Sequence, residues 1–152
     1  MASRRSAGLL MYRERDGAIE VLLAHPGGPL FAKKDLEHWT IPKGEYDDDE
    51  DPLEAARREF AEETGLTSQP PYIALGEIRQ KGGKLVRAWA FKGDCDPSTI
   101  VSNTFELEWP PKSGKMQRFP EVDRCEFFSI AQATRKIKES QIPLIEALQN
   151  AR

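Results

Sequence analysis

The sequence predicts a single α/β domain of the α+β kind, in which a mixed β-sheet lies between helices. Three observations support this prediction. The chain has 152 residues, the length of one domain that can bury a real core. Its strand-like and helix-like segments do not alternate regularly, so a mixed rather than an all-parallel sheet is expected. No internal repeat or low-complexity linker divides the chain, and we therefore expect one domain over residues 1–152.

The N-terminal part of the chain is predicted to form β-strands. Residues 6–14 and 18–25 are apolar-rich runs on either side of the turn "RDG". The stretch "HPGGP" then breaks the chain and begins a loop that runs to Glu37. We expect a short strand at residues 38–42, which ends at Pro42.

The middle of the chain predicts one helix followed by two strands. The helix covers residues 52–64, with Pro52 in its first turn and Gly65 just after its end, which is the usual placement of these two residue types. The strands cover residues 72–80 and 84–93 and are joined by the tight turn "KGG".

The C-terminal part predicts one further strand at 104–109, a basic loop at 110–121 and a short strand at 126–130. Two helices, at 129–138 and 142–150, end the chain. These helices could form a dimer interface or simply cover the sheet, so the sequence leaves the oligomeric state open.

Composition excludes several classes of protein. A net charge of −3 argues against a nucleic-acid-coating protein, and we expect no DNA partner. No apolar run is long enough to span a membrane, and no signal peptide is recognisable, so we expect a cytoplasmic protein. Cys95 and Cys125 are far apart and form no CxxC pair, which argues against a disulfide or a thiolate zinc site. We expect His25 and His38 in loops or at the surface, not as metal ligands.

The predicted helix at 52–64 carries an unusual acidic face. Glu59, Glu62 and Glu63 stand at i, i+3 and i+4, so their carboxylates share one side of the helix and repel one another. Arg58 lies one turn before Glu62 and can pair with it. A hard divalent cation such as Mg²⁺ or Mn²⁺ would remove the repulsion. A solvated face of salt bridges is the alternative that the helix by itself leaves open.

The stretch 44–66 resembles the Nudix box, whose pattern is G-x5-E-x7-R-E-U-x-E-E-x-G-U, with U an aliphatic residue. The residues in register with it are Gly44, Glu50, Arg58, Glu59, Glu62, Glu63, Gly65 and Leu66. Phe60 departs from the pattern at the first U position but keeps its hydrophobic character. The preceding "WTIPKGE" and the order of strands also look like this family.

The resemblance implies a Nudix hydrolase, which uses Mg²⁺ or Mn²⁺ to cleave a nucleoside diphosphate linked to another moiety. By resemblance, Glu59, Glu62 and Glu63 would bind the metal, together with the carbonyl oxygen of Gly44. Arg58 would orient these glutamates. Glu50 would support the geometry between loop and helix through Arg58.

The family commonly adds a carboxylate from outside the box as a metal ligand or general base. Several members place it six residues before an aromatic residue that opens the last strand. Glu121 lies six residues before Phe127 and is the first choice, and Glu106 and Glu108 are the next candidates. The base could equally be Glu62 or Glu63.

The substrate is less well determined. Lys43, beside the box, and Arg118, in the basic loop, are candidates to bind phosphate. Tyr46 is a candidate to stack on a base, whereas Trp39 is expected in the core. The resemblance favours a small nucleotide, either a dinucleoside polyphosphate or a nucleoside triphosphate, and 5′-capped or triphosphate RNA is also possible. A nucleotide-sensing module without turnover is the alternative.

Overall fold

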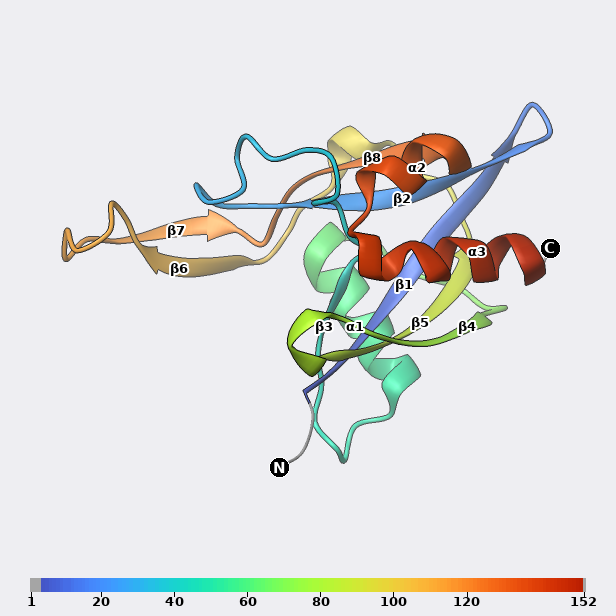
Figure 1. Cartoon of the computed structure of the whole chain (residues 1–152), viewed down its shortest axis with the longest axis horizontal. Coiled ribbons are helices and arrows are strands. Elements are labelled where there is room, and N and C mark those ends of the chain that lie inside the picture. Colours follow the sequence, from blue (N-terminus) through green and yellow to red (C-terminus); the bar gives the residue numbers. More distant parts are fainter. Residues whose placement is uncertain (1–3, 152) are drawn as a thin grey trace.

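A six-stranded mixed β-sheet forms the centre of the protein in a computed structural model, which describes residues 4–151 (Figure 1). Its strands are β1 (Arg5–Arg15), β2 (Ala18–Pro26), β3 (Lys43–Glu45), β4 (Ile73–Arg79), β5 (Leu85–Lys92) and β8 (Val122–Ser129). They lie in the order β4-β5-β1-β2-β8, and β3 also pairs with β1. Because β1 is parallel to β5 and antiparallel to β2 and β3, the predicted mixed sheet is confirmed.

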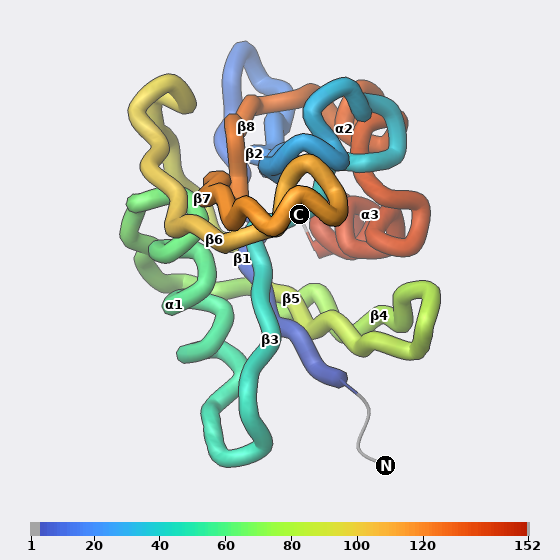
Figure 2. The backbone as a smooth tube through the Cα atoms, turned by 90° about the vertical axis from the view of Figure 1, so that its left-hand side faces the viewer, coloured from blue at the N-terminus to red at the C-terminus, as the bar shows by residue number. Residues whose placement is uncertain are grey.

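Helices cover both faces of the sheet, as Figures 1 and 2 show. They are α1 (Pro52–Thr64) on one face, and α2 (Ile130–Lys136) and α3 (Ile142–Ala151) on the other. Successive side chains of a strand point to opposite faces. Leu9 of β1 therefore packs in the same cluster as Phe60 of α1, while its neighbour Leu10 packs in the cluster on the side of α2 and α3.

Strand β3 lies in line with β2 along the same side of β1. The first part of β1 pairs with β3, for example Ser6 with Glu45, and the last part pairs with β2, for example Tyr12 with Val21. The chain must therefore leave the sheet between β2 and β3. This arrangement places the short strand β3 next to α1, where the acidic residues lie.

The strand predicted at 38–42 is wrong. Only single bridges form there, between Thr40 and Ala24 and between Trp39 and Ile137. The backbone N–H of Ile41 donates to the side-chain carbonyl of Gln141 at 3.0 Å instead of to a neighbouring strand. The apolar side chains of this segment are buried, with Trp39 1 % exposed, as was expected of that residue.

Helix α1 has the predicted bounds, because local signals fix both of its ends. The carboxylate of Asp51 accepts a hydrogen bond from the N–H of Glu54 at 3.0 Å, and Pro52 occupies the first turn. Gly65 ends the helix in the left-handed region at φ 75°, and its N–H donates to the carbonyl of Ala61 at 2.8 Å.

A separate two-stranded β-hairpin projects from the body of the molecule (Figure 1). It consists of β6 (Thr104–Glu108) and β7 (Met116–Pro120). The strand predicted at 104–109 is confirmed, whereas the loop predicted at 110–121 is wrong for residues 116–120. These residues form β7 because their partner strand precedes them, with Phe105 opposite Phe119.

The last strand is longer than predicted, because β8 extends back to Val122 through its pairing with β2. The first C-terminal helix begins after Ser129, whose hydroxyl accepts from the N–H of Gln132 in a capping box, and it ends at Lys136. Within residues 4–151, three short 3₁₀ turns connect other elements: η1 (Lys81–Gly83), η2 (Pro97–Thr99) and η3 (Glu139–Gln141).

The loop or surface position predicted for His25 is wrong, since this residue lies near the end of β2 with no exposed surface. Its Nδ1 lies 2.8 Å from Oδ1 of Asp123, and its Nε2 lies 2.6 Å from the carbonyl oxygen of Lys34. Cys95 and Cys125 are free thiols. Among residues 4–151, no helix is both long and apolar enough to cross a lipid bilayer.

Candidate active site

Gly44 of β3 lies directly against the side chain of Glu59 on helix α1. A Cβ atom added to Gly44 would overlap the carboxylate of Glu59. Glu59 is itself buried on α1, with 9 % of its surface exposed. The backbone of β3 and the acidic face of α1 therefore meet at this point.

An open hollow of about 420 Å³ lies where β3 meets α1. On its acidic side it is lined by Gly44, Glu59, Glu62, Glu63, Asn103 and Glu121. On its other side it is lined by Ser6, Lys43, Glu45 and Lys84. The hollow thus has an anionic part, largely from α1, beside a part that contains two lysines.

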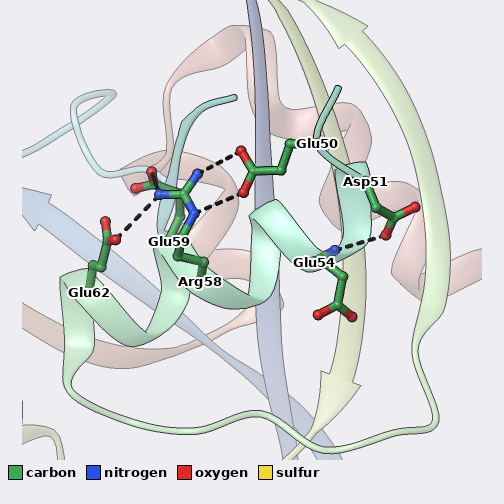
Figure 3. A network of polar contacts seen from close by, with 6 residues as sticks. All are labelled: Glu50, Asp51, Glu54, Arg58, Glu59 and Glu62. Atoms are coloured by element: carbon green, nitrogen blue, oxygen red, sulfur yellow. Dashed lines mark hydrogen bonds and ion pairs between the residues drawn. The ribbon is translucent and has the colours of Figure 1, made fainter. Parts of the chain in front are cut away.

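Arg58 holds three carboxylates at once, as Figure 3 shows. Its Nε and Nη2 donate to the two oxygens of Glu50 at 2.9 and 3.1 Å, which is a bidentate pair. Its Nη1 donates to Oε1 of Glu59 at 2.9 Å and to Oε1 of Glu62 at 3.3 Å. The hydrogen bonds to Glu50 are the largest cause of a raised pKa of Arg58, and the guanidinium stays charged. The contacts expected of Arg58 with Glu62 and Glu50 are confirmed.

Burial and mutual repulsion perturb the acids of this hollow. Burial, followed by the charge of Glu59, raises the pKa of Glu63 to about 8. Burial, followed by the charge of Glu62, also raises the pKa of Glu59. Burial raises the pKa of Glu121, whose charge acts on both Glu59 and Glu63. Without a cation, the protein thus resists ionising all of these carboxyl groups together.

The pKa of Lys43, which lines the hollow, shifts in the opposite direction. Burial, followed by the charges of Lys84 and Lys138, lowers the pKa of Lys43 to about 8. Its backbone N–H donates to Oε1 of Glu63 at 3.3 Å, which connects β3 to the acidic face of α1. Burial, followed by the charge of Lys84, also lowers the pKa of Lys138. Three ammonium groups therefore lie near one another beside the acidic part.

The acidic part has the donor chemistry of a divalent-cation site. It offers carboxylate oxygens, the ligands that Mg²⁺ and Mn²⁺ prefer, and a positive ion would relieve the repulsion between them. Within residues 4–151, however, no group of three or more His, Cys, Asp or Glu side chains is already gathered around one point. One oxygen each of Glu59 and Glu62 is bound to Arg58. The donors fit a cation, but their side chains would have to converge on it.

Glu121 lines the hollow, whereas Glu106 and Glu108, the next candidates after it, do not. Glu121 follows β7 at the root of the hairpin, where its N–H donates to the carbonyl of Asn103 at 2.8 Å. Glu106 pairs with Arg118 on the hairpin at 3.4 Å. Glu108 accepts from backbone N–H groups in the hairpin turn.

Two residues considered for substrate binding lie elsewhere. Arg118 is exposed on β7, outside the residues that line the hollow. Tyr46 is partly buried against the core cluster on the side of α1. Sequence reasoning missed Ser6, Lys84 and Asn103, which come from strand ends and a loop. Nothing in the linear sequence marks them, because tertiary contacts bring them to the hollow: strand pairing for Ser6 and Lys84, and a hydrogen bond from the N–H of Asn103 to the carbonyl of Glu62 at 2.7 Å.

Comparison with known proteins gives one family-level match. The model of the NUDIX domain matches residues 2–148. An asymmetrical bis(5′-nucleosyl)-tetraphosphatase of Caenorhabditis elegans is 43% identical over 65 residues, which cover 43% of each protein. An RNA pyrophosphohydrolase of Rhizobium meliloti (strain 1021) is 35% identical over 104 residues, which cover 59% of this chain and 57% of that protein. The chain thus spans about half the length of the curated relatives it matches.

Solved structures of NUDIX proteins have the same fold as this chain. A C. elegans Ap4A hydrolase in a binary complex superposes with a TM-score of 0.64 at 26% identity, covering 97% of this chain and 96% of that one. The NUDIX domain of Shewanella oneidensis NrtR, in complex with ADP ribose, superposes with a TM-score of 0.68 at 16% identity. It covers 99% of this chain and 89% of that one, and at this identity it supports the fold alone.

Proposed function

The chain belongs to the NUDIX domain family, and on that premise we propose that it is a pyrophosphohydrolase that cleaves a phosphoanhydride bond of a nucleoside polyphosphate. The observation that carries the proposal is the hollow at β3, which is lined by five glutamates and two lysines. A polyphosphate ester requires both the acidic part and the lysine-containing part of the hollow. Its reacting phosphate binds at the metal site, and its other phosphates bind to the lysine side chains.

The acidic part would hold the metal ion. The family generally uses divalent cations, and we propose Mg²⁺, with Mn²⁺ as a substitute. When bound, such an ion lowers the pKa of a water molecule and polarises a phosphoryl oxygen. Glu59, Glu62 and Glu63 would bind it together with the carbonyl oxygen of Gly44. Arg58 would keep Glu59 and Glu62 oriented while the ion takes their remaining oxygens.

The proton of the attacking water needs an acceptor. Glu121 lies outside the box and lines the same hollow, and this supports our proposal that it acts as a metal ligand or as the base. Glu62 and Glu63 are the other candidates for the base. Whichever group accepts the proton, water does the attack, and no covalent intermediate with a side chain is required.

The lysine part would bind the phosphates that do not react. Lys43 lines the same hollow as the glutamates and lies near Lys84, so its ammonium group can hold the chain of phosphates beside the metal site. We propose a dinucleoside polyphosphate or a nucleoside triphosphate as the substrate, in keeping with the tetraphosphatase relatives. The RNA pyrophosphohydrolase relatives make the 5′-triphosphate end of RNA the third candidate.

Activity against a panel of substrates tests the proposal. The panel contains diadenosine polyphosphates, canonical and oxidised nucleoside triphosphates, ADP-ribose, nucleotide sugars and 5′-triphosphate RNA, each with Mg²⁺, Mn²⁺ or EDTA. We expect hydrolysis of one preferred substrate, which is lost with EDTA and in Glu63→Gln. Glu54→Gln is the matched control, since Glu54 is an exposed acid on α1 that pairs with Arg57 outside the hollow. Binding of a nucleotide without any turnover would instead support a nucleotide-sensing module.

A further inference from the structure

Strand β8 has one residue more than the part of β2 with which it pairs. The ladder is regular up to His25, which lies opposite Arg124. The next pair is Pro26 with Val122, so Asp123 has no residue opposite it. Such an extra residue is a β-bulge, and bulges are common beside active sites, where they bend a strand or aim a side chain. This bulge lies at the start of β8, where the hairpin joins the sheet (Figure 1).

The bulge changes the face of the sheet that the first side chains of β8 reach. Side chains of a regular strand alternate between the two faces, and a shift of one residue reverses them. Cys125 packs in the cluster on the side of α1, so regular alternation would put Asp123 on that side and Val122 on the other. Val122 instead packs in the cluster on the side of α1. Asp123 contacts His25, whose ring lies 5.1 Å from that of Trp39 in the opposite cluster.

The side chain of His25 holds the extra residue in this position. Its imidazole ring has no exposed surface. Its Nδ1 lies 2.8 Å from Oδ1 of Asp123, and its Nε2 lies 2.6 Å from the carbonyl oxygen of Lys34. A hydrogen bond to a carboxylate is stronger than one between neutral groups, and a buried ring nitrogen without a partner is costly. The ring therefore favours the backbone conformation in which Asp123 turns toward it.

The bulge also fixes the backbone on both sides of Glu121. The N–H of Gly27 donates to the carbonyl of Glu121 at 2.9 Å, and the N–H of Glu121 donates to the carbonyl of Asn103 at 2.8 Å. In a ladder without the extra residue, Gly27 would lie opposite Val122 and not beside Glu121. The N–H of Asn103 donates in turn to the carbonyl of Glu62 at 2.7 Å. The backbone at Glu121 is thus linked to the acidic face of α1, and loss of the bulge would shift it.

We propose that His25 and Asp123 are positioning residues for the reaction, because their contact fixes the bulge and thereby holds Glu121 beside the glutamates of α1. The inference rests on the proposed function, in which Glu121 is a metal ligand or the base. His25 and Asp123 are not among the residues that line the hollow, so neither touches the substrate. They act through the backbone of Glu121.

Substitutions of Asp123 test this role, because its side chain is 30% exposed, whereas a smaller residue at the buried His25 would leave a cavity. Asp123→Ala removes the partner of Nδ1, so kcat should fall about tenfold while KM changes by less than about twofold. Asp123→Asn keeps a side chain that can accept from or donate to the ring, so kcat should stay within about twofold of normal. Glu126→Ala, an exposed acid in the regular part of β8, is the matched control and should change neither value.

A double variant shows whether the effect passes through Glu121. In a Glu121→Gln background, Asp123→Ala should cause no further fall in kcat, because the carboxylate that it misplaces is already absent. An equal fall in both backgrounds would overturn the inference. A lower melting temperature of Asp123→Ala with an unchanged kcat would also overturn it, because the contact would then be structural only.

Amide hydrogen exchange tests the geometry even where no substrate of the panel is hydrolysed. The N–H of Gly27 donates to the carbonyl of Glu121, so it should exchange faster by about tenfold or more in Asp123→Ala and at the normal rate in Asp123→Asn. This faster exchange in a protein without turnover would refute the proposed function but support the hold of the bulge on Glu121. Unchanged exchange in Asp123→Ala would overturn the inference.

Discussion

Replacing Glu63 by glutamine should stabilise the metal-free protein while it destroys activity. In the folded chain, burial and the charge of Glu59 raise the pKa of Glu63 from 4.5 to about 8. Between these two values the folded protein keeps a proton that the unfolded chain has released. The free energy of unfolding therefore falls as the pH rises from about 4.5 to about 8, and it levels off above that range.

The size of the effect follows from the same two values. Each pKa unit corresponds to about 1.36 kcal/mol, so the gap between 4.5 and about 8 amounts to on the order of 5 kcal/mol when fully developed. Glutamine carries no charge at any of these pH values, and it keeps the Oε1 atom that accepts from the N–H of Lys43 at 3.3 Å. The variant should thus lose the electrostatic cost and retain the hydrogen bond.

Urea denaturation in EDTA at a series of pH values is the appropriate measurement. At pH 9, Glu63→Gln should be more stable than the unchanged protein by several kcal/mol, and near pH 4 the two should be nearly equal. Glu54→Gln, on the exposed side of α1, is the control and should show a small difference with little dependence on pH. A Glu63→Gln variant that is less stable at pH 9, or a difference independent of pH, would refute the reasoning. With Mg²⁺ present the order should reverse, because the cation stabilises only the protein that binds it.

Three further substitutions test other parts of the site. Arg58→Lys removes the bidentate contact with Glu50. We expect kcat to fall at least about tenfold in steady-state kinetics, and the free energy of unfolding to fall by about 1 to 2 kcal/mol in urea denaturation. An unchanged kcat would show that Arg58 is not needed to orient the glutamates. Gly44→Ala introduces a Cβ that overlaps the carboxylate of Glu59 and must displace it, so steady-state kinetics should show kcat lower by about tenfold or more. Normal kcat would contradict the contact between Gly44 and the Glu59 carboxylate. Glu121→Gln should lower kcat about 100-fold or more and remove the acidic limb of the pH–rate profile if Glu121 is the base; a retained acidic limb would assign the base to the box.

The hairpin of β6 and β7 shows how far local patterns reach. Residues 104–109 have the composition of a strand, and that prediction is confirmed. Residues 116–120 contain a proline and a single basic residue, Arg118, and their strand depends on pairing with β6, in which Phe119 lies opposite Phe105. A similar limit applies at 38–42, where the N–H of Ile41 finds its partner in Gln141, 100 residues away along the chain. Signals within a few residues cannot specify such partners.

The sequence by itself determined helix α1, its acidic face and the family to which they point. Each of these depends on spacings of a few residues: the caps at Asp51 and Gly65, the one-turn steps between the glutamates, and the pairing of Arg58 with its neighbours.

Tertiary structure alone decided how the hollow is completed. Lys84 and Glu45 are 39 residues apart and meet above Ser6 only because β3 and β5 pair with opposite sides of β1. Helical neighbours are fixed by the 3.6-residue turn, whereas strand neighbours are chosen by the packing of the whole sheet, and half of this site is made of strand neighbours.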